Sequence, residues 1–164
     1  MAKVLVKKLN PSVQLPKYKT LGSSGMDLMA FISETIIISP NRLHIIPTGI
    51  SVSIPRNFEI QIRPRSGLAA KNQVSVLNTP GTIDADYRGE LKVILINLGK
   101  KNFFVESGTR IAQMVMCPII KAKIKEVKSL ESTSRGSGGF GSTGMKWAMK
   151  INLKEFKRFE KQII

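Results

Sequence analysis

The densest group of acidic side chains in this sequence lies in the stretch GTIDADYRGE, residues 81–90, which holds Asp84, Asp86 and Glu90. The whole chain has only eleven acidic residues, so their clustering is informative. A carboxylate held near a reacting atom can take a proton from water, which is general-base chemistry. On a strand, alternation would place Asp84 and Asp86 on the same face. Gly and Asp are also turn residues, and Arg88 could pair with Asp86, so a plain turn stays open as the alternative.

The segment PRSGLAA, residues 64–70, is suited to an anion. Arg65 supplies a positive charge and Ser66 a hydroxyl, and the backbone N–H of Gly67 can approach an anion closely. The residues Ala-Ala-Lys that follow favour a short helical turn. An ordinary turn into a helix, with Ser66 near its cap, explains the same residues without a ligand.

Two further segments each place one polar side chain among apolar neighbours. In SSGMDLMA, residues 23–30, Asp27 is either satisfied by backbone N–H groups or directed at a cation. In GTRIAQM, residues 108–114, Gln113 follows an apolar pair and could donate a hydrogen bond to phosphate. Each of these signals is weak when it is taken alone.

The stretch RGSGGFGSTG, residues 135–144, is half glycine and carries one aromatic side chain, Phe140. Its GFGSTG portion fits the dinucleotide pattern G-x-G-x-x-G, but only twenty residues follow Gly144, too few for the βαβ unit that this pattern needs. A flexible linker and a mobile arm that closes on a ligand therefore remain. The arm is favoured because an arginine, an aromatic face, two hydroxyls and many backbone N–H groups suit a base with phosphates.

The elements that would position these side chains are short β-strands. Runs rich in Ile and Val, several of them alternating apolar with polar residues, are separated by Gly and Pro at close intervals. This pattern predicts an all-β antiparallel sandwich or barrel. The expected strands cover residues 35–39, 44–54, 58–64, 91–98 and 110–120.

The bulk composition excludes several classes of protein. The 164 residues, 42% of them hydrophobic, suffice for one domain with a sizeable core, and no apolar run of eighteen residues predicts a membrane span. No secretory signal is recognisable at the N-terminus, so the cytoplasm is the default localisation. A single cysteine, Cys117, excludes an internal disulfide, and with the single histidine, His44, it cannot build a deaminase-type zinc site. A Ser-His-Asp triad would need His44, which lies in a strand-like run.

The formal charge of +15 favours a polyanionic partner. Much of this charge is scattered as lysines, so nucleic-acid binding is a possible but secondary hypothesis. In residues 145–164, Leu153, Phe156, Phe159 and Ile163 recur at roughly helical spacing between lysines, which predicts a short basic amphipathic helix. Docking on the body or on a neighbouring subunit is favoured over contact with an anionic surface.

Five short motifs follow one another between Gly25 and Gly144: GMDL, PRSGLA, N-x-x-G-x-I-D-x-D-Y-R-G, G-x-R-I-A-Q and R-G-x-G-G-F-G-S-T-G. Their order resembles the five-part signature of the trimeric deoxyuridine triphosphatases, the dUTPases. The resemblance covers nearly the whole chain apart from its ends. The third and fifth motifs are specific enough that chance agreement of all five is negligible.

The resemblance implies a jelly-roll-like β-domain over residues 1–134 that forms a homotrimer, with three active sites at subunit interfaces. Residues 135–144 would be the mobile arm, closing over the nucleotide from another subunit, and residues 145–164 a basic extension past the usual end of the family. The reaction implied is dUTP plus water to dUMP plus pyrophosphate, with Mg²⁺.

Matching motif positions also implies roles for individual residues. Asp84 would deprotonate the water that attacks the α-phosphorus in line, and Tyr87 would lie under the deoxyribose. Lys92 falls where the family places a residue against the substrate. The uracil edge would be read by the side chain of Asn78 and by backbone groups that include Gly81, Thr82 and Ile83.

The same matching assigns the phosphates and the metal. Asp27 would reach Mg²⁺ through a water molecule. The arm would stack Phe140 on uracil, and its glycines, Gly141 among them, would permit the turns. The side chains and backbone expected on the phosphates are those of Arg65, Ser66, Gly67 and Gln113, with Arg135, Ser142 and Thr143 from the arm.

Two other functions stay open at this point. A dCTP deaminase shares the fold, but it attacks a base carbon and would not need the water-activating Asp84 together with a complete closing arm. The basic charge also allows a non-catalytic regulator or nucleic-acid binder built on a dUTPase body.

Overall fold

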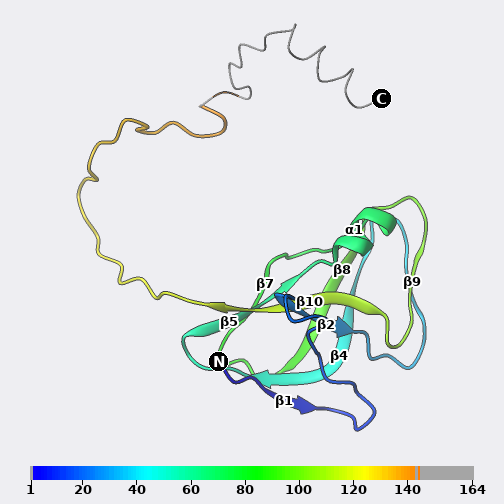
Figure 1. Cartoon of the computed structure of the whole chain (residues 1–164). Coiled ribbons are helices and arrows are strands. Elements are labelled where there is room, and N and C mark those ends of the chain that lie inside the picture. The colour runs from blue at the N-terminus through cyan, green and yellow to red at the C-terminus, as the bar shows by residue number, and fades with distance from the viewer. Residues whose placement is uncertain (1, 143, 145–164) are drawn as a thin grey trace, which may run out of the picture. The chain divides into compact units, whose positions relative to one another are not determined.

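The computed structural model describes residues 2–142 and 144. The chain divides into two units, Met1–Ala122 and Lys123–Ile164. The first unit holds every strand and the single helix found among the described residues (Figure 1). In the second unit, residues 123–142 and 144 contain turns but no strand or helix. Thr143 and the expected extension 145–164 lie outside the described residues.

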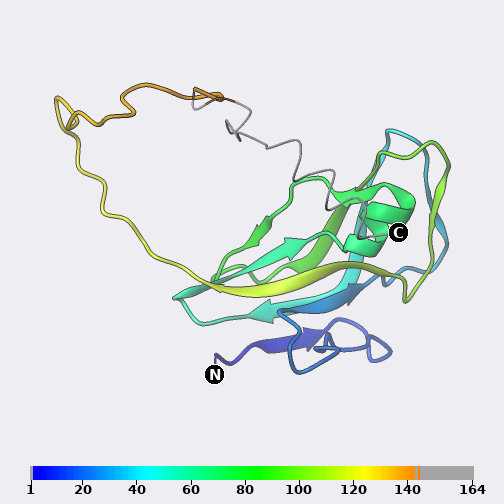
Figure 2. The same cartoon turned by 45° about the horizontal axis from the view of Figure 1, so that its top comes forward.

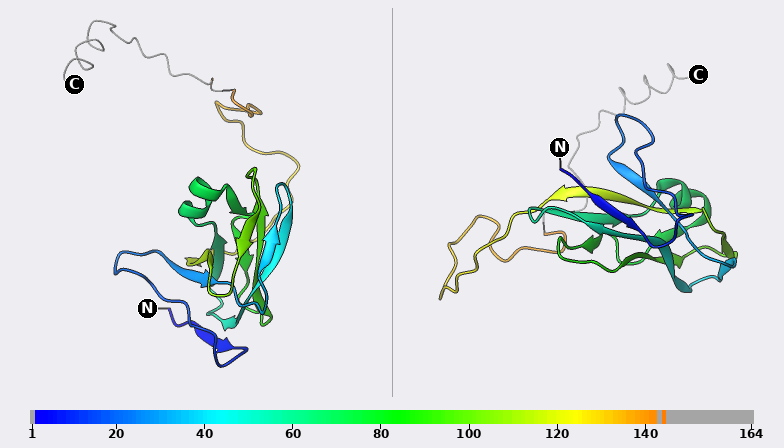
Figure 3. Two further views of the ribbon diagram at one scale, coloured as in Figure 1. Left: turned by 90° about the vertical axis from the view of Figure 1, so that its right-hand side faces the viewer. Right: turned by 90° about the horizontal axis from the view of Figure 1, so that it is seen from below.

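The first unit is built from antiparallel strands in three sheets. One four-stranded sheet has the order β1-β4-β8-β6, a second has the order β2-β10-β5-β7, and β3 pairs with β9. Figures 2 and 3 show α1 at one end of the strands and β1 at the outer edge of its sheet. The elements are β1 (Leu5–Lys8), β2 (Gly25–Met29), β3 (Ile36–Ile38), β4 (Leu43–Ser53), β5 (Phe58–Arg63), α1 (Ser66–Asn72), β6 (Val74–Val76), β7 (Gly81–Ile83), β8 (Glu90–Asn97), β9 (Phe103–Val105) and β10 (Arg110–Pro118).

The core lies where the inward-facing residues of the sheets meet. In β8, Leu91, Val93 and Leu95 are buried while the residues between them are not, which is the period of two that a half-buried strand requires. Burial of each large aliphatic side chain contributes about 1.5–3 kcal/mol. The antiparallel, mostly β architecture confirms the fold class expected from the sequence.

A bulge in β4 fixes where β8 begins. The register between β4 and β8 shifts between Pro47 and Ser51. Within the bulge, the Thr48 hydroxyl donates to the Leu91 carbonyl over 2.6 Å and the Gly49 N–H donates to Glu90 Oε1 over 2.9 Å. Gly49 has φ +69°, and a Cβ there would lie 2.5 Å from Val13, so only glycine fits.

The structure corrects one predicted strand that bears on the candidate site. Strand β7 ends at Ile83, and residues 84–89 form a turn, so Asp84 and Asp86 do not alternate along a strand. The sequence alone also left out the short strands β1, β2, β6, β7 and β9. The helix expected around RSGLAAK is present as α1.

Candidate functional site

Asp27 lies between two arginines. Arg65 Nε donates to Asp27 Oδ1 over 2.9 Å, and Arg110 NH1 donates to Asp27 Oδ2 over 3.1 Å. The Asp27 side chain is 16% exposed, whereas those of Arg65 and Arg110 are 25% and 46% exposed. The carboxylate therefore orients two guanidinium groups that keep donors free for an anion.

Sheet register brings these three side chains together from distant parts of the chain. Gln113 of β10 pairs with Asp27 of β2 on one side and with Arg63 of β5 on the other. Directly paired residues share a face of the sheet, so Asp27 and Gln113 project to the same side. Arg65 follows β5 at the N-terminal boundary of α1. The sequence placed Arg65, Asp27 and Gln113 at the site but missed Arg110, although Arg110 is the arginine of the G-x-R-I-A-Q motif.

Gln113 packs tightly against Gly25. Its Nε2 donates to the Pro64 carbonyl over 3.0 Å, which ties β10 to the segment before α1. A Cβ on Gly25 would lie 2.6 Å from Gln113 Oε1, so a side chain at position 25 would displace the amide. Ser66 and Gly67 are exposed at the start of α1, and nothing lies within 4 Å of a Cβ built on Gly67.

The second group of expected site residues lies around β7. Gly81 is buried, and a Cβ there would lie 3.0 Å from Asn78 Nδ2, so the amide of Asn78 rests directly over the start of the strand. Thr82 is exposed and Ile83 is half-buried, and their backbone groups pair with Gln61 and Ile60 of β5.

The turn after β7 holds Asp84 and Tyr87 at the surface. The Tyr87 hydroxyl donates to the Glu90 carbonyl over 3.0 Å. Arg88 donates to the carbonyls of Ala85 and Tyr87, over 2.7 and 2.8 Å, rather than to the Asp86 carboxylate. The pairing of Arg88 with Asp86 that the turn alternative allowed is therefore absent from the described part of the chain.

Asp84 lines a hollow of about 730 Å³ that also receives three cationic side chains. These side chains are Arg56, Arg88 and Lys121. Lys92 projects from β8 with its side chain 54% exposed, and its Nζ lies 3.9 Å from Glu90 Oε2. The surroundings of Asp84 thus suit an anionic ligand in contact with a carboxylate.

Within one chain, the Asp27 group and Asp84 are far apart. Asp27 and Arg63 both pair with Gln113, so Asp27 lies at the height of Arg63 of β5, and its strand β2 is three strands away from β7. Asp84 follows Ile83 of β7, which pairs with Ile60 of β5. Strand spacings of about 4.8 Å and residue steps of about 3.3 Å put the two carboxylates on the order of 20 Å apart. The structure therefore collects the expected residues into two groups rather than one.

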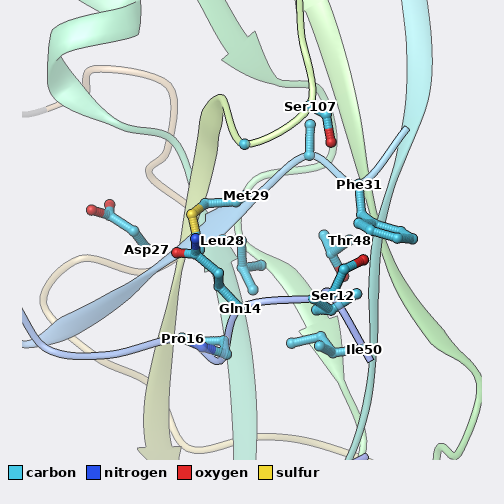
Figure 4. Close-up of a pocket in the computed structure, with 13 residues that line it drawn as sticks. Ser12, Gln14, Pro16, Asp27, Leu28, Met29, Phe31, Thr48, Ile50 and Ser107 are labelled. Carbon is cyan, nitrogen blue, oxygen red and sulfur yellow. The ribbon is translucent and has the colours of Figure 1, made fainter. Parts of the chain in front are cut away.

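A pocket of about 280 Å³ adjoins β2 on the other side of Asp27. Figure 4 shows the Asp27 carboxylate pointing away from Thr48, Ile50 and Phe31, which line this pocket together with Asp27. Asp84 is not among the residues that line it. The polar chemistry of Asp27 is therefore directed to the arginines and not into this pocket.

The expected arm residues that the structure describes lie in the second unit. Arg135 Nε donates to the Gly138 carbonyl over 2.9 Å, and the Ser142 N–H donates to the Gly139 carbonyl over 3.0 Å. Phe140 is fully exposed, with φ +49°, and Gly141 has φ +88°. The described part of this segment is a series of tight turns around an exposed aromatic ring.

The fold and these side chains define a mostly β, antiparallel protein with two arginines held on one carboxylate and a separate exposed carboxylate. A model of the dUTPase family matches residues 12–144, which include all five motifs, and the chain belongs to the dUTPase family.

Individual relatives agree with this assignment. The chain is 58% identical over 146 residues to the deoxyuridine 5'-triphosphate nucleotidohydrolase of Rickettsia bellii (strain OSU 85-389), covering 88% of this chain and 97% of that protein. It is 54% identical over 144 residues to the same enzyme of Hydrogenobaculum sp. (strain Y04AAS1), covering 88% and 99%. A mutant dUTPase of Staphylococcus bacteriophage 80alpha, solved with dUpNHpp, superimposes with a TM-score of 0.78 at 27% identity, covering 87% and 98%.

Proposed function

We propose that this chain, a dUTP diphosphatase, hydrolyses dUTP to dUMP and pyrophosphate through Asp84 acting as general base. The reaction lowers dUTP and supplies dUMP for thymidylate synthesis. The observation that carries the activity is the family match over residues 12–144, which covers every candidate site residue. The exposure of Asp84 on a turn beside three cations supports its place next to the α-phosphate.

Base and sugar are recognised by β7 and the segments on either side of it. Asn78 and the backbone of Gly81, Thr82 and Ile83 read the uracil edge, and the close packing of Asn78 on Gly81 supports a slot too narrow for a thymine methyl group. Tyr87, held by its hydrogen bond to the Glu90 carbonyl, lies against the deoxyribose and excludes a 2′-hydroxyl.

The phosphates bind to Arg65, Ser66, Gly67 and Gln113. We add Arg110 to this set, because it pairs with the same carboxylate, Asp27, as Arg65 does. Asp27 is the carboxylate nearest to these groups, and carboxylate oxygens suit Mg²⁺. No cluster of three or more metal-ligating side chains occurs among residues 2–142 and 144, so a Mg²⁺ ion reached by Asp27 through a water molecule would take most of its ligands from phosphate oxygens and water. Mg²⁺ would neutralise charge on the leaving pyrophosphate, and the two arginines act in the same direction.

Replacing Gly25 by alanine should weaken substrate binding without unfolding the protein. The closest contact of the new methyl group is the end of the Gln113 side chain, and Val115 lies 3.2 Å away. A lost hydrogen bond to a charged group costs about 1.5–3 kcal/mol, a factor of roughly ten to one hundred in KM. Steady-state kinetics with dUTP measure this. Gly22→Ala is the control, because nothing lies within 4 Å of a Cβ there. An unchanged KM in Gly25→Ala would contradict a phosphate role for Gln113.

The separation of the two residue groups supports a site shared between subunits, as the proposed homotrimer of jelly-roll-like domains requires. The β- and γ-phosphates are bonded neighbours of the α-phosphorus that Asp84 must approach. Asp84 and the Arg65 group of one chain, about 20 Å apart by sheet register, cannot both contact one triphosphate. The site therefore takes Asp84 from one subunit and Arg65, Arg110 and Gln113 from another.

An apolar sheet face supports the location of the subunit contact. Lys92, Ile94 and Ile96 project from the same face of β8, and register places Ile45 opposite Ile94 and Leu43 opposite Ile96. Leu43 and Ile45 are 51% and 50% exposed in the single chain. Contiguous exposed aliphatic side chains mark a surface that a partner covers. The outward position of Lys92 on this face agrees with a substrate bound between subunits.

Substituting Ile45 by lysine should separate the subunits and remove activity. Three buried ammonium groups would be introduced per trimer, each without a partner, and removing a charge from water costs several kcal/mol. Sedimentation velocity should show a monomer, and specific activity should fall at least tenfold at nanomolar concentration. Ile37→Lys is the matched control, since Ile37 is 53% exposed on the separate β3-β9 sheet. Equal effects of both changes would refute the assigned interface.

Residues 135–144 act as the closing arm of the proposed site. The exposed ring of Phe140 is available to stack on uracil, and Arg135, Ser142 and Thr143 are placed in sequence to meet the β- and γ-phosphates. Ordering this segment costs conformational entropy, so closure is favourable only with a triphosphate that repays that cost.

One paired assay separates the proposed reaction from its nearest rival. The protein is incubated with Mg²⁺ and either dUTP or dCTP, and pyrophosphate and ammonia are measured. Pyrophosphate from dUTP without ammonia from dCTP is the expected result. Ammonia from dCTP would identify a deaminase and overturn the proposal.

A further inference from the structure

A second cationic site lies at the far end of α1 from Arg65. Three lysines and three amide side chains surround a hollow of about 320 Å³, and we refer to it as the lysine pocket. The lysines come from two segments that are distant in the sequence, the last turn of α1 and the connection between β8 and β9. The side chains are those of Lys71, Lys100 and Lys101, with Asn72, Gln73 and Asn102.

A buried asparagine fixes the segment that carries two of these lysines. Asn97 is fully buried, and its Nδ2 donates to the carbonyls of Ile38 and Lys101 over 2.7 and 2.8 Å. Its Oδ1 accepts the Gly99 N–H over 2.9 Å. The backbone positions of Lys100 and Lys101 are therefore set from the core, and not by a free loop.

The same segment is tied to the end of α1. The Leu98 N–H donates to the Gln73 carbonyl over 2.9 Å. A Cβ on Gly99 would lie 2.9 Å from the Asn72 carbonyl, so the two backbones approach as closely as glycine permits. This contact brings Lys71 to the same hollow as Lys100 and Lys101.

The lysine pocket holds charge that nothing nearby neutralises. No carboxylate lines it. Among residues 2–142 and 144, no ion pair includes any of its three lysines. The carboxyl end of α1 offsets only about half a unit charge, so a net positive charge remains.

We propose that the lysine pocket binds the phosphate backbone of a nucleic acid, at a site separate from the nucleotide-hydrolysing one. The three lysines are exposed and remain hydrated, so each would hold a single free phosphate ion weakly. A polyanion gains instead from the release of its condensed counterions at each lysine. The +15 charge of the chain adds long-range attraction for such a ligand.

The amide side chains fit the same ligand. Asn72, Gln73 and Asn102 can donate hydrogen bonds to phosphate and sugar oxygens, which is how proteins position a nucleic acid without reading its sequence. Contacts to phosphate and sugar oxygens carry no sequence information, so the binding is expected to be independent of sequence.

The test uses the full chain with Lys71, Lys100 and Lys101 all changed to glutamine, and a fluorescently labelled oligothymidylate as probe. Binding is followed by anisotropy between about 50 and 200 mM salt, where loss of three contacts should lower the slope of log K against log salt by about two. The matched control changes three exposed lysines elsewhere, Lys3, Lys17 and Lys19, to glutamine. Its slope should stay near that of the unmodified chain.

Three results would overturn the proposal. They are an unchanged slope in the lysine-pocket variant, an equal loss in the control variant, and tight binding of inorganic phosphate, measured by calorimetry, that depends on these lysines while oligothymidylate binding does not. The last result would assign the pocket to a free anion. Turnover of dUTP should be the same in both variants and the unmodified chain, which confirms that they are folded and that the two sites are distinct.

Discussion

The Asp84→Asn protein is expected to lose dUTP turnover by roughly a hundredfold to ten-thousandfold, the contribution typical of a general base. Asparagine keeps the size of the side chain and its ability to hydrogen-bond a water molecule, but it cannot take the proton when that water attacks phosphorus. Asp84 is exposed on a turn, so the substitution should leave the fold intact. The measurement is kcat for pyrophosphate release, together with dUTP affinity by calorimetry.

Asp86→Asn provides a matched control for this experiment. Asp86 lies in the same turn, is exposed, and lines the same hollow as Asp84. Removing its charge changes the local electrostatics by the same amount without removing the proposed base. Comparable losses of kcat in both variants would mean that negative charge in the turn matters and that proton transfer to Asp84 does not. A large loss in Asp84→Asn alone, with dUTP affinity retained, fits only a role in the chemical step.

A chain that ends at Ser134 is expected to lose most turnover while its oligomeric state persists. The strands, the Asp27 group and the turn that follows β7 all lie before this point, so folding and assembly should be retained. The truncated protein lacks Phe140 and Arg135, so the bound nucleotide is neither stacked nor closed off from water. Loss of closure is expected to lower kcat/KM for dUTP by about a hundredfold, as a small misplacement of reacting groups typically does.

A chain that ends at Gly144 separates the arm from the basic extension. This protein keeps Arg135 through Gly144 and lacks only residues 145–164. Activity near that of the full chain would assign the loss to the arm, and Phe140→Ala in the full chain should then reproduce part of it. Full activity in the chain ending at Ser134 would refute a catalytic role for residues 135–144.

The distance between the two groups of site residues within one chain is the reason for proposing a site shared between subunits. Asp27 holds Arg65 and Arg110 in place on one sheet, and Asp84 is presented by a turn at a distant position of the same sheet. In the proposed shared site, one subunit supplies the Asp27 group and another supplies Asp84. Disrupting the interface at Ile45 should therefore also reduce activity, because it separates the two halves of the proposed site.

Much of the site could be predicted from the sequence because its chemistry is carried in short contiguous segments. The order of five motifs, the scarcity of acidic residues and the alternation of apolar residues in strands such as β8 determined the family, the all-β class and the candidate residues. These features depend on residue type and local spacing, and both are properties of the sequence before the chain folds. The turn at residues 84–89 was harder to predict from the sequence, because GTIDADYRGE suits a strand and a turn equally well. Only the pairing of β5 with Gly81–Ile83, which stops at Ile83, shows where the strand ends and the turn begins.

Only the tertiary structure decided which residues meet. Arg110 joins Arg65 on Asp27 because β10 lies beside β2 and next to β5, an arrangement that long-range strand pairing determines and local sequence does not. Lys71 meets Lys100 and Lys101 because Gly99 lets the β8–β9 connection touch the end of α1. The reason is physical: strand order and register follow from burying one shared core, a property of the whole chain, whereas residue type and spacing belong to each segment by itself.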